Sequence, residues 1–196
     1  MLTKFKDKFD KVLIFLAQPF IRRGIPPNTI TFLGLLIAWC YLFVALTKPF
    51  LFSITLPSLF ILSALMDCID GVVARVRKKR TKRGAFLDSV IDRIVDSIYI
   101  VSLYFLDILT IEESFILLVG SLMISYTRAR AESLGLSLAA VGFAERAERT
   151  IITLAIIIAF VTGIPPFFLN ILKIFYIVAV YLTFLYRVYY TVLHLR

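Results

Sequence analysis

Two segments of this chain read DCIDGVVAR, residues 67–75, and GAFLDSVID, residues 84–92. In helices, Asp67 and Asp70 are three residues apart and Asp88 and Asp92 are four apart, so each pair shares one helical face. If the two helices pack side by side, the four carboxylates converge. Such a concentration of negative charge at the end of a membrane bundle requires neutralisation, and oxygen ligands suit Mg²⁺ or Mn²⁺. The four aspartates are therefore predicted to bind divalent metal.

Small residues and one arginine are placed between these aspartates. Gly71 and Ala74 follow Asp70, and Gly84 lies one turn before Asp88. Small residues allow a second helix or a ligand to approach closely, and Arg75 can hold a phosphate through two hydrogen bonds. The alternative is that the aspartates only cap helix ends and solvate an exposed turn. That alternative does not account for four aspartates at these spacings with glycine and arginine between them.

The residues fit the pattern D-x2-D-G-x2-A-R-x8-G-x3-D-x3-D, which resembles the signature of the CDP-alcohol phosphatidyltransferases, with every fixed position present. The resemblance implies a homodimeric transferase that moves a phosphatidyl-type group from a CDP-linked lipid to an alcohol and releases CMP. It implies two Mg²⁺ or Mn²⁺ ions per site and Asp92 as the general base. It also implies that the CDP-lipid contacts Asn28, Thr31, Asp67, Gly71, Ala74, Arg75, Thr81 and Gly84.

Composition places the chain in a membrane. Of its 196 residues 60% are hydrophobic and the mean hydropathy is +0.92, whereas a soluble domain is about half apolar. The net charge of +9 indicates basic cytoplasmic loops and anionic lipids or ligands. We expect no nucleic-acid partner, because the basic residues flank apolar segments. We also expect no disulfide, no zinc site and no cleavable signal peptide.

The hydrophobic pattern predicts one all-α membrane domain over residues 1–196, with six transmembrane helices and an N-terminal amphipathic interfacial helix. Pro19 is expected to begin the break after the first helix, and Pro57 to kink the second span. Asn28 is expected either to cap the first span or to contact the donor. The interfacial helix is expected at 1–17 and the spans at 29–46, 50–76, 84–106, 114–131, 145–162 and 167–193.

Basic residues predict the orientation. Most of them are expected on one side of the membrane: at the N-terminus, in the segments Arg77–Arg83 and Arg128–Arg149, and at Arg196. By the positive-inside rule, this side of the cell membrane is the cytoplasmic one, and both termini and the aspartates face it. A small cation transporter is the remote alternative, since intramembrane carboxylates can carry cations. A transporter should hold its carboxylates near mid-bilayer, whereas these lie within about two turns of the span ends.

The acceptor is predicted from the remaining arginines, because a phosphorylated acceptor brings about two negative charges to a carboxylate-rich site. The alternatives are membrane anchoring and ion pairs with Glu132, Glu145 and Glu148. The segments SYTRARAE and ERAER, residues 125–132 and 145–149, resemble those of the inositol phosphate branch of the family, which includes phosphatidylinositol phosphate and archaetidylinositol phosphate synthases. The predicted contacts to 1-myo-inositol phosphate are Arg128, Arg130, Arg149 and Arg187.

Arg128 replaces the lysine expected in bacterial members of this branch, which favours an archaeal-type, archaetidyl-transferring enzyme. Glycerol 3-phosphate or another alcohol remains an alternative acceptor. The sequence leaves open diacylglycerol against archaeol tails, and Mg²⁺ against Mn²⁺. Asp96 lies outside the signature and is expected either to support the site indirectly or to pair with Arg93.

Overall fold

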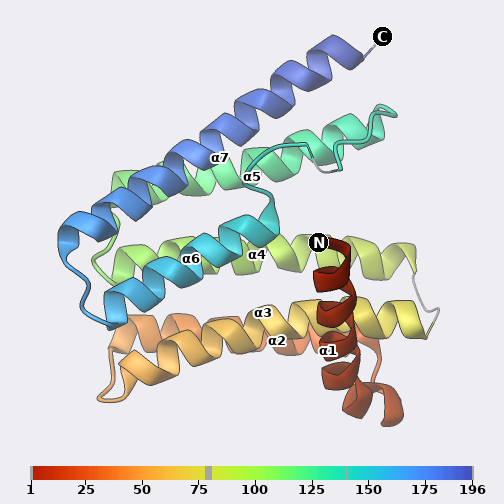
Figure 1. Ribbon diagram of the computed structural model, residues 1–196, viewed down its shortest axis with the longest axis horizontal. Coiled ribbons are helices and arrows are strands. Elements are labelled where there is room, and N and C mark those ends of the chain that lie inside the picture. Colours follow the sequence, from red (N-terminus) through yellow and green to blue (C-terminus); the bar gives the residue numbers. More distant parts are fainter. Residues whose placement is uncertain (1, 78–80, 140, 196) are drawn as a thin grey trace. The chain divides into compact units, whose positions relative to one another are not determined.

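The computed structural model describes residues 2–77, 81–139 and 141–195, and side chains from Val12 onward. Within these ranges the chain is all-helical, with seven helices (Figure 1). Their bounds are α1 Leu2–Arg22, α2 Pro27–Thr47, α3 Phe52–Val76, α4 Lys82–Phe105, α5 Ile111–Ser133, α6 Arg146–Val161 and α7 Pro166–His194. The chain forms two compact units, Met1–Tyr41 with Ser58–Val95 and Leu42–Pro57 with Asp96–Arg196.

The helices from α2 to α7 begin and end within three residues of the six predicted spans. Among the described residues, α2, α3 and α7 are long and apolar enough to cross a membrane. Helices α4 and α5 carry more charged or polar residues, and α6 has only 16 residues. The apolar composition of the chain therefore identifies a membrane protein. In the part of the chain that the structure describes, helix length and helix composition support three of the six predicted spans.

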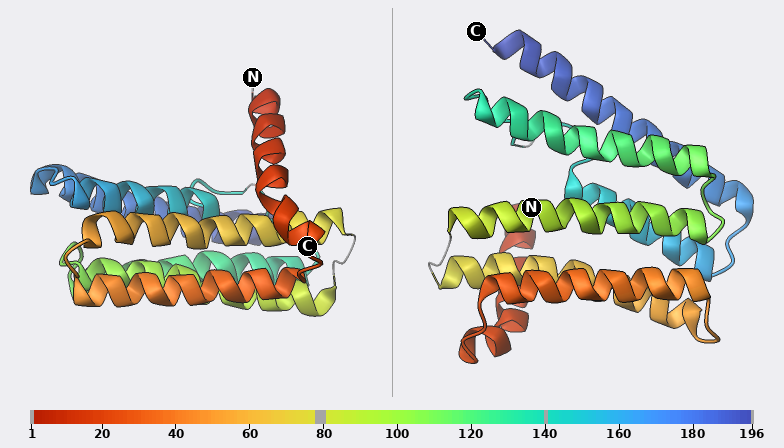
Figure 2. Two further views of the ribbon diagram at one scale, coloured as in Figure 1. Left: turned by 90° about the horizontal axis from the view of Figure 1, so that it is seen from below. Right: turned by 180° about the vertical axis from the view of Figure 1, so that it is seen from behind.

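Helix α1 packs against α2 and α3 in the first unit. Leu13 and Ala17 of α1 are buried in one cluster with Ile30 of α2 and Val73 of α3, and α1 runs steeply across these two helices (Figure 2). Phe15, on the other side of α1, is 70% exposed. One face of α1 is thus buried against α2 and α3, while the apolar side chain of Phe15 stays exposed on the opposite face.

Pro19 does not end α1, contrary to expectation, because the helix continues to Arg22. The carbonyl of Pro19 accepts a hydrogen bond from the Arg23 backbone nitrogen at 3.2 Å. Arg77, at the end of α3, donates to the carbonyl oxygens of Ile21 (2.6 Å) and Ile25 (3.1 Å). Arg77 therefore satisfies carbonyls at the end of α1, a role that its place in a basic run did not indicate. Lys78, Lys79 and Arg80 of that run lie outside the described residues.

A glycine allows α2 and α3 to approach closely. A Cβ atom at Gly34 would lie 3.1 Å from Cβ of Met66, and the Ser63 hydroxyl donates to the Gly34 carbonyl at 2.9 Å. This contact lies directly before Asp67 in α3. Close packing at Gly34 therefore holds α3 beside α2 at the point where its aspartates begin.

The second unit is built on α7, which packs against α5 and α6. A Cβ atom at Gly120 of α5 would lie 2.7 Å from Cγ1 of Val180, and the Tyr181 hydroxyl donates to the Ile116 carbonyl at 3.0 Å. These α5–α7 contacts leave no room for a larger residue at Gly120. Helix α7 is therefore fixed closely against α5.

Helix α5 begins at Ile111, three residues before the predicted span at 114. Thr110 and Glu113 form a capping box, in which the Thr110 hydroxyl accepts from the Glu113 backbone nitrogen and the Glu113 carboxylate accepts from the Thr110 nitrogen. This reciprocal bonding stabilises a helix start. Glu112 and Glu113, which precede the predicted span, therefore form the first turn of α5.

Candidate active site

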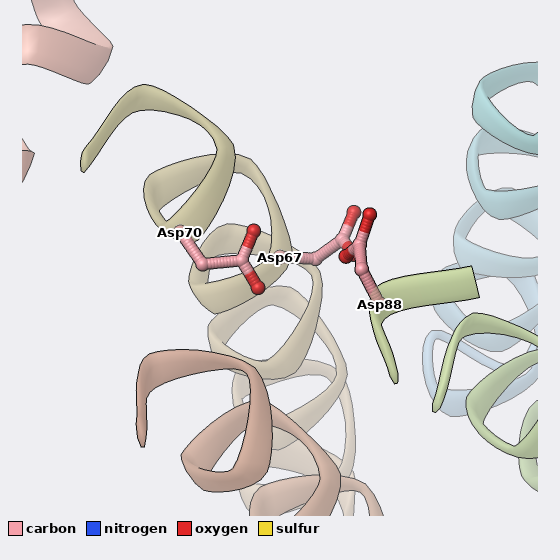
Figure 3. A group of neighbouring side chains, drawn as sticks. All are labelled: Asp67, Asp70 and Asp88. Carbon is pink, nitrogen blue, oxygen red and sulfur yellow. The ribbon is translucent and has the colours of Figure 1, made fainter. Parts of the chain in front are cut away.

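Three of the four predicted metal ligands lie together in the first unit. Asp67 and Asp70 project from α3 and Asp88 from α4 (Figure 3), and one carboxylate oxygen from each lies within 4.8 Å of the others. Asp70 is 5% exposed. Three carboxylates this close repel one another unless a cation lies between them, and an all-oxygen set suits Mg²⁺ or Mn²⁺. The chemistry and spacing of the group therefore fit a divalent metal.

Asp92 follows Asp88 by one turn of α4 and is not a member of this group of three. Its Oδ2 lies 3.5 Å from Nη1 of Arg93, and its side chain is 14% exposed. The Arg93 Nη1 also donates to the Ser89 carbonyl at 2.8 Å. The aspartate expected to act as the base is thus partly buried on the same helix as one of the clustered carboxylates.

A cavity of about 270 Å³ adjoins the carboxylates, and Asp70 and Asp88 form part of its wall. Its remaining lining comes from the N-terminal end of α2, the C-terminal end of α3, and the N-terminal end of α4 with the residue before it, all in the first unit. Asp67 and Arg75, also predicted to contact the donor, are not on this wall, and Arg75 is exposed. The other lining residues are Pro27, Asn28, Thr31, Gly71, Ala74, Thr81, Gly84 and Ala85; Pro27 and Ala85 were not predicted.

The two signature glycines have different surroundings. A Cβ atom at Gly71 would meet no other atom within 4 Å, whereas at Gly84 it would lie 3.1 Å from Thr81 Oγ1 and 3.2 Å from Asn28 Oδ1. Gly71 therefore keeps the cavity open, and it is not required for close helix packing. Gly84 allows the beginning of α4 to approach the beginning of α2.

Thr81 and Asn28 have local roles that the sequence only partly predicted. The Thr81 hydroxyl accepts from the Gly84 backbone nitrogen at 3.0 Å, so Thr81 acts as the N-cap of α4. Asn28 lies inside the first turn of α2, which begins at Pro27. Asn28 is therefore not the helix cap, and its side chain lies at the cavity wall.

Arg187 joins α7 to the segment between α5 and α6. Its side chain is 3% exposed. Its Nε and Nη1 donate to the carbonyls of Val141 (2.7 Å) and Ile124 (2.9 Å), and its Nη2 donates to the Glu145 carboxylate (2.9 Å). A guanidinium has five N–H donors, so these bonds leave donors for an anion while they hold the segment in place.

Thr183 holds the same segment beside Arg187. Its hydroxyl accepts from the backbone nitrogens of Phe143 (3.1 Å) and Ala144 (2.8 Å). Gly142 has φ of +120°, and a Cβ atom there would lie 2.5 Å from Thr183 Cγ2. Both the backbone conformation and the close contact require glycine. Neither contact could be predicted, because Thr183 follows this segment by some forty residues in the sequence.

The other predicted acceptor contacts differ in exposure. Arg149, in the first turn of α6, has a side chain that is 4% exposed and pairs with Asp96 at 2.7 Å. Arg128 is 44% exposed and pairs with Glu132 at 2.9 Å. Arg130 is exposed at the last turn of α5. All four predicted arginines thus belong to the second unit, two of them buried and two at its surface.

Comparison with known proteins identifies the family. A family model described as CDP-alcohol phosphatidyltransferase matches residues 25–185. Archaetidylinositol phosphate synthase of Pyrococcus horikoshii is 35% identical over 193 residues, which cover 96% of this chain and 95% of the relative.

Solved structures have the same fold. The crystal structure of Mycobacterium tuberculosis phosphatidylinositol phosphate synthase with CDP-DAG bound superimposes with a TM-score of 0.75 at 30% identity, over 92% of this chain and 94% of that one. The same enzyme in complex with manganese and citrate gives 0.75 at 32% identity, over 91% and 88%. The family match includes the carboxylate group and every residue that lines the adjoining cavity. The chain is therefore a transferase of the CDP-alcohol phosphatidyltransferase family.

Proposed function

We propose that this enzyme transfers an archaetidyl group from a CDP-linked archaeol to 1-myo-inositol phosphate and releases CMP. The observation that carries the proposal is 35% identity to an archaetidylinositol phosphate synthase over 96% of the chain. The cavity beside the aspartates, lined by six of the residues predicted to contact the donor, supports the CDP-linked donor.

The CDP part of the donor would occupy that cavity. The polar side chains of Asn28, Thr31 and Thr81 line it, while Gly71 leaves its wall open. Arg75 lies outside the wall and is exposed, so it would meet the donor only at the cavity rim. A solved relative at 30% identity has CDP-DAG bound, which supports a CDP-linked lipid as the donor.

The reaction would be an in-line attack of an acceptor hydroxyl on the lipid-proximal phosphorus of the donor. Asp92 would take the hydroxyl proton as the new O–P bond forms and the bond from phosphorus to the CMP oxygen breaks. Asp67, Asp70, Asp88 and Asp92 would hold two divalent ions, which neutralise pyrophosphate charge and favour departure of CMP. A solved relative contains manganese, which supports a divalent cofactor.

The acceptor phosphate would be bound by the arginines of the second unit. Arg149 and Arg187 are held in place by hydrogen bonds within that unit, and Arg128 and Arg130 remain exposed. A preformed set of guanidinium groups loses little freedom when it binds a phosphate. Arg149 and Arg187 would therefore supply fixed contacts to the phosphate, and Arg128 and Arg130 would supply contacts from the exposed surface.

An acceptor and donor panel tests this assignment. We expect purified enzyme with Mg²⁺ to release CMP from CDP-archaeol in the presence of 1-myo-inositol phosphate, and much more slowly with free inositol, serine or glycerol 3-phosphate. Free inositol and serine lack the phosphate that the arginines would bind, and glycerol 3-phosphate lacks the inositol ring whose hydroxyl would be the nucleophile. CDP-diacylglycerol in a parallel series tests the lipid tails. Turnover with glycerol 3-phosphate but not inositol phosphate would refute the acceptor and leave the family unchanged.

We further propose that α2 to α7 all span the membrane, that α1 lies at the cytoplasmic interface, and that the enzyme is a homodimer. An exposed apolar residue of α1, Phe15, supports interfacial contact. Lys82 and Arg83 at the start of α4 support a cytoplasmic active site by the positive-inside rule. Cross-linking in native membranes tests the dimer.

Cysteine labelling tests the orientation. In a background in which Cys40 and Cys68 are replaced by alanine, cysteines at Lys82 and Glu148 should react with a membrane-impermeant maleimide only after cells are permeabilised. A cysteine at Glu112, exposed in the first turn of α5, should react in intact cells and serves as the matched control. Labelling at Lys82 in intact cells would overturn the orientation.

A further inference from the structure

Asp96 bridges two arginines of α6 within the second unit. Its Oδ2 lies 2.7 Å from Nη2 of Arg149 and its Oδ1 lies 3.3 Å from Nε of Arg146. The Asp96 side chain is 11% exposed. Asp96 is not part of the signature, and neither it nor Arg146 was among the predicted site residues. One partly buried carboxylate therefore orients two neighbouring guanidinium groups.

The bridge leaves Arg149 oriented but incompletely bonded. Its Nη2 is held by Asp96 and its Nη1 donates to the Ala144 carbonyl at 3.2 Å. Its Nε is buried and has no hydrogen-bond partner among the described residues. A buried charged donor without a partner is unfavourable. An anion that accepts from this nitrogen would remove that cost.

Asp96 also holds the two arginines near one another. Arg146 and Arg149 are three residues apart on α6, and both face the same carboxylate. The charge of Asp96 reduces the repulsion between the two guanidinium groups, which would otherwise separate them.

We propose that Asp96 is a positioning residue that holds Arg146 and Arg149 in the geometry that binds the acceptor phosphate. The inference rests on the proposed function, since it assigns the phosphate of the acceptor to this group. It adds Arg146 to the predicted phosphate contacts and gives Asp96 a role through the arginines, without contact to the reacting atoms.

Steady-state kinetics of Asp96→Asn test the proposal. The amide keeps the shape of the carboxylate but removes the charge and one acceptor. We expect the KM for inositol phosphate to rise by roughly tenfold to a hundredfold, as for other losses of substrate positioning, with the KM for the CDP-lipid unchanged. Asp107→Asn is the matched control: Asp107 pairs with Lys48 at 2.7 Å and is 85% exposed, and asparagine tolerates its φ of +61°.

A double-mutant cycle separates positioning from general stability. If Asp96 acts through Arg149 as well as Arg146, Asp96→Asn should raise the acceptor KM by a smaller factor in the Arg149→Ala background than in the wild type, because residues of one network are not additive. A loss that is merely structural would lower the melting temperature and the activity towards both substrates in either background. Independent, fully additive effects on the acceptor KM would overturn the proposal.

Asp96→Glu provides the test if Asp96→Asn does not fold. It keeps the charge but displaces the carboxylate by one methylene, so the acceptor KM should rise while the donor KM stays constant; an unchanged acceptor KM refutes the positioning role. Wild-type enzyme that uses glycerol 3-phosphate would refute only the inositol assignment, and the same cycle then applies to that acceptor. Wild-type enzyme that uses only unphosphorylated alcohols would refute both.

Discussion

Asp92→Asn is expected to reduce CMP release by roughly a hundredfold to ten-thousandfold, the range typical of a lost general base. The amide cannot take the acceptor proton, but it has nearly the same shape as the carboxylate. Asp92 is not on the wall of the proposed donor cavity, so the affinity for the CDP-lipid should be retained. Single-turnover CMP release checks the loss of turnover, and binding of a CDP-lipid analogue to the same preparation checks the retained donor affinity.

Asp92→Glu is the matched variant, because it restores a carboxylate one methylene further from α4. It should recover part of the turnover, because its carboxylate can still take the proton, whereas a role that needs neither charge nor basicity would let the two variants differ little in rate. Near-normal turnover in Asp92→Asn would show that another group takes the proton. Loss of donor affinity in the same variant would instead assign Asp92 to binding.

Removal of divalent metal should abolish turnover completely. The proposed ligands Asp67, Asp70 and Asp88 place carboxylate oxygens within 4.8 Å of one another, and a site of this charge needs a cation before a pyrophosphate can approach. Dialysis against EDTA followed by titration with Mg²⁺ or Mn²⁺ should restore activity. Asp67→Asn and Asp88→Asn should raise the metal concentration needed for half-maximal rate.

Thermal unfolding gives a readout of the metal site that does not depend on activity. Mn²⁺ should raise the melting temperature of the wild-type protein, since a ligand that binds only the folded state stabilises it. Without metal, Asp67→Asn should be at least as stable as wild type, because it removes repulsion among three carboxylates. Its stabilisation by Mn²⁺ should be smaller. Full activity after EDTA dialysis, or an equal Mn²⁺ shift in Asp67→Asn, would contradict the assignment.

Local patterns determined the helices and the carboxylate group. Apolar runs bounded by proline, glycine and charged residues predicted the helices α2 to α7 within three residues, because helix limits depend on nearby sequence. The spacing of Asp67 and Asp70 placed both on one face of α3 for the same reason. The early start of α5 was also readable, since Thr110 and Glu113 have the spacing of a capping box.

Helix α1 shows where local rules were insufficient. Pro19 predicted a break, yet α1 continues to Arg22, and Arg77, directly after α3, bonds to the carbonyls of Ile21 and Ile25. Burial of Leu13 and Ala17 against α2 and α3 adds packing that propensity alone does not include. Tertiary contacts therefore outweighed the local preference of one proline.

The sequence by itself determined the family, the aspartate spacing and the positions of the helices, because each depends on residues a few positions apart. Only the tertiary structure decided the partners of the charged side chains. Asp96 bonds to Arg149, and Arg187 bonds to the carbonyl of Val141, across separations of about fifty residues. The long arginine side chain can reach many such partners, and only packing of the helices selects among them.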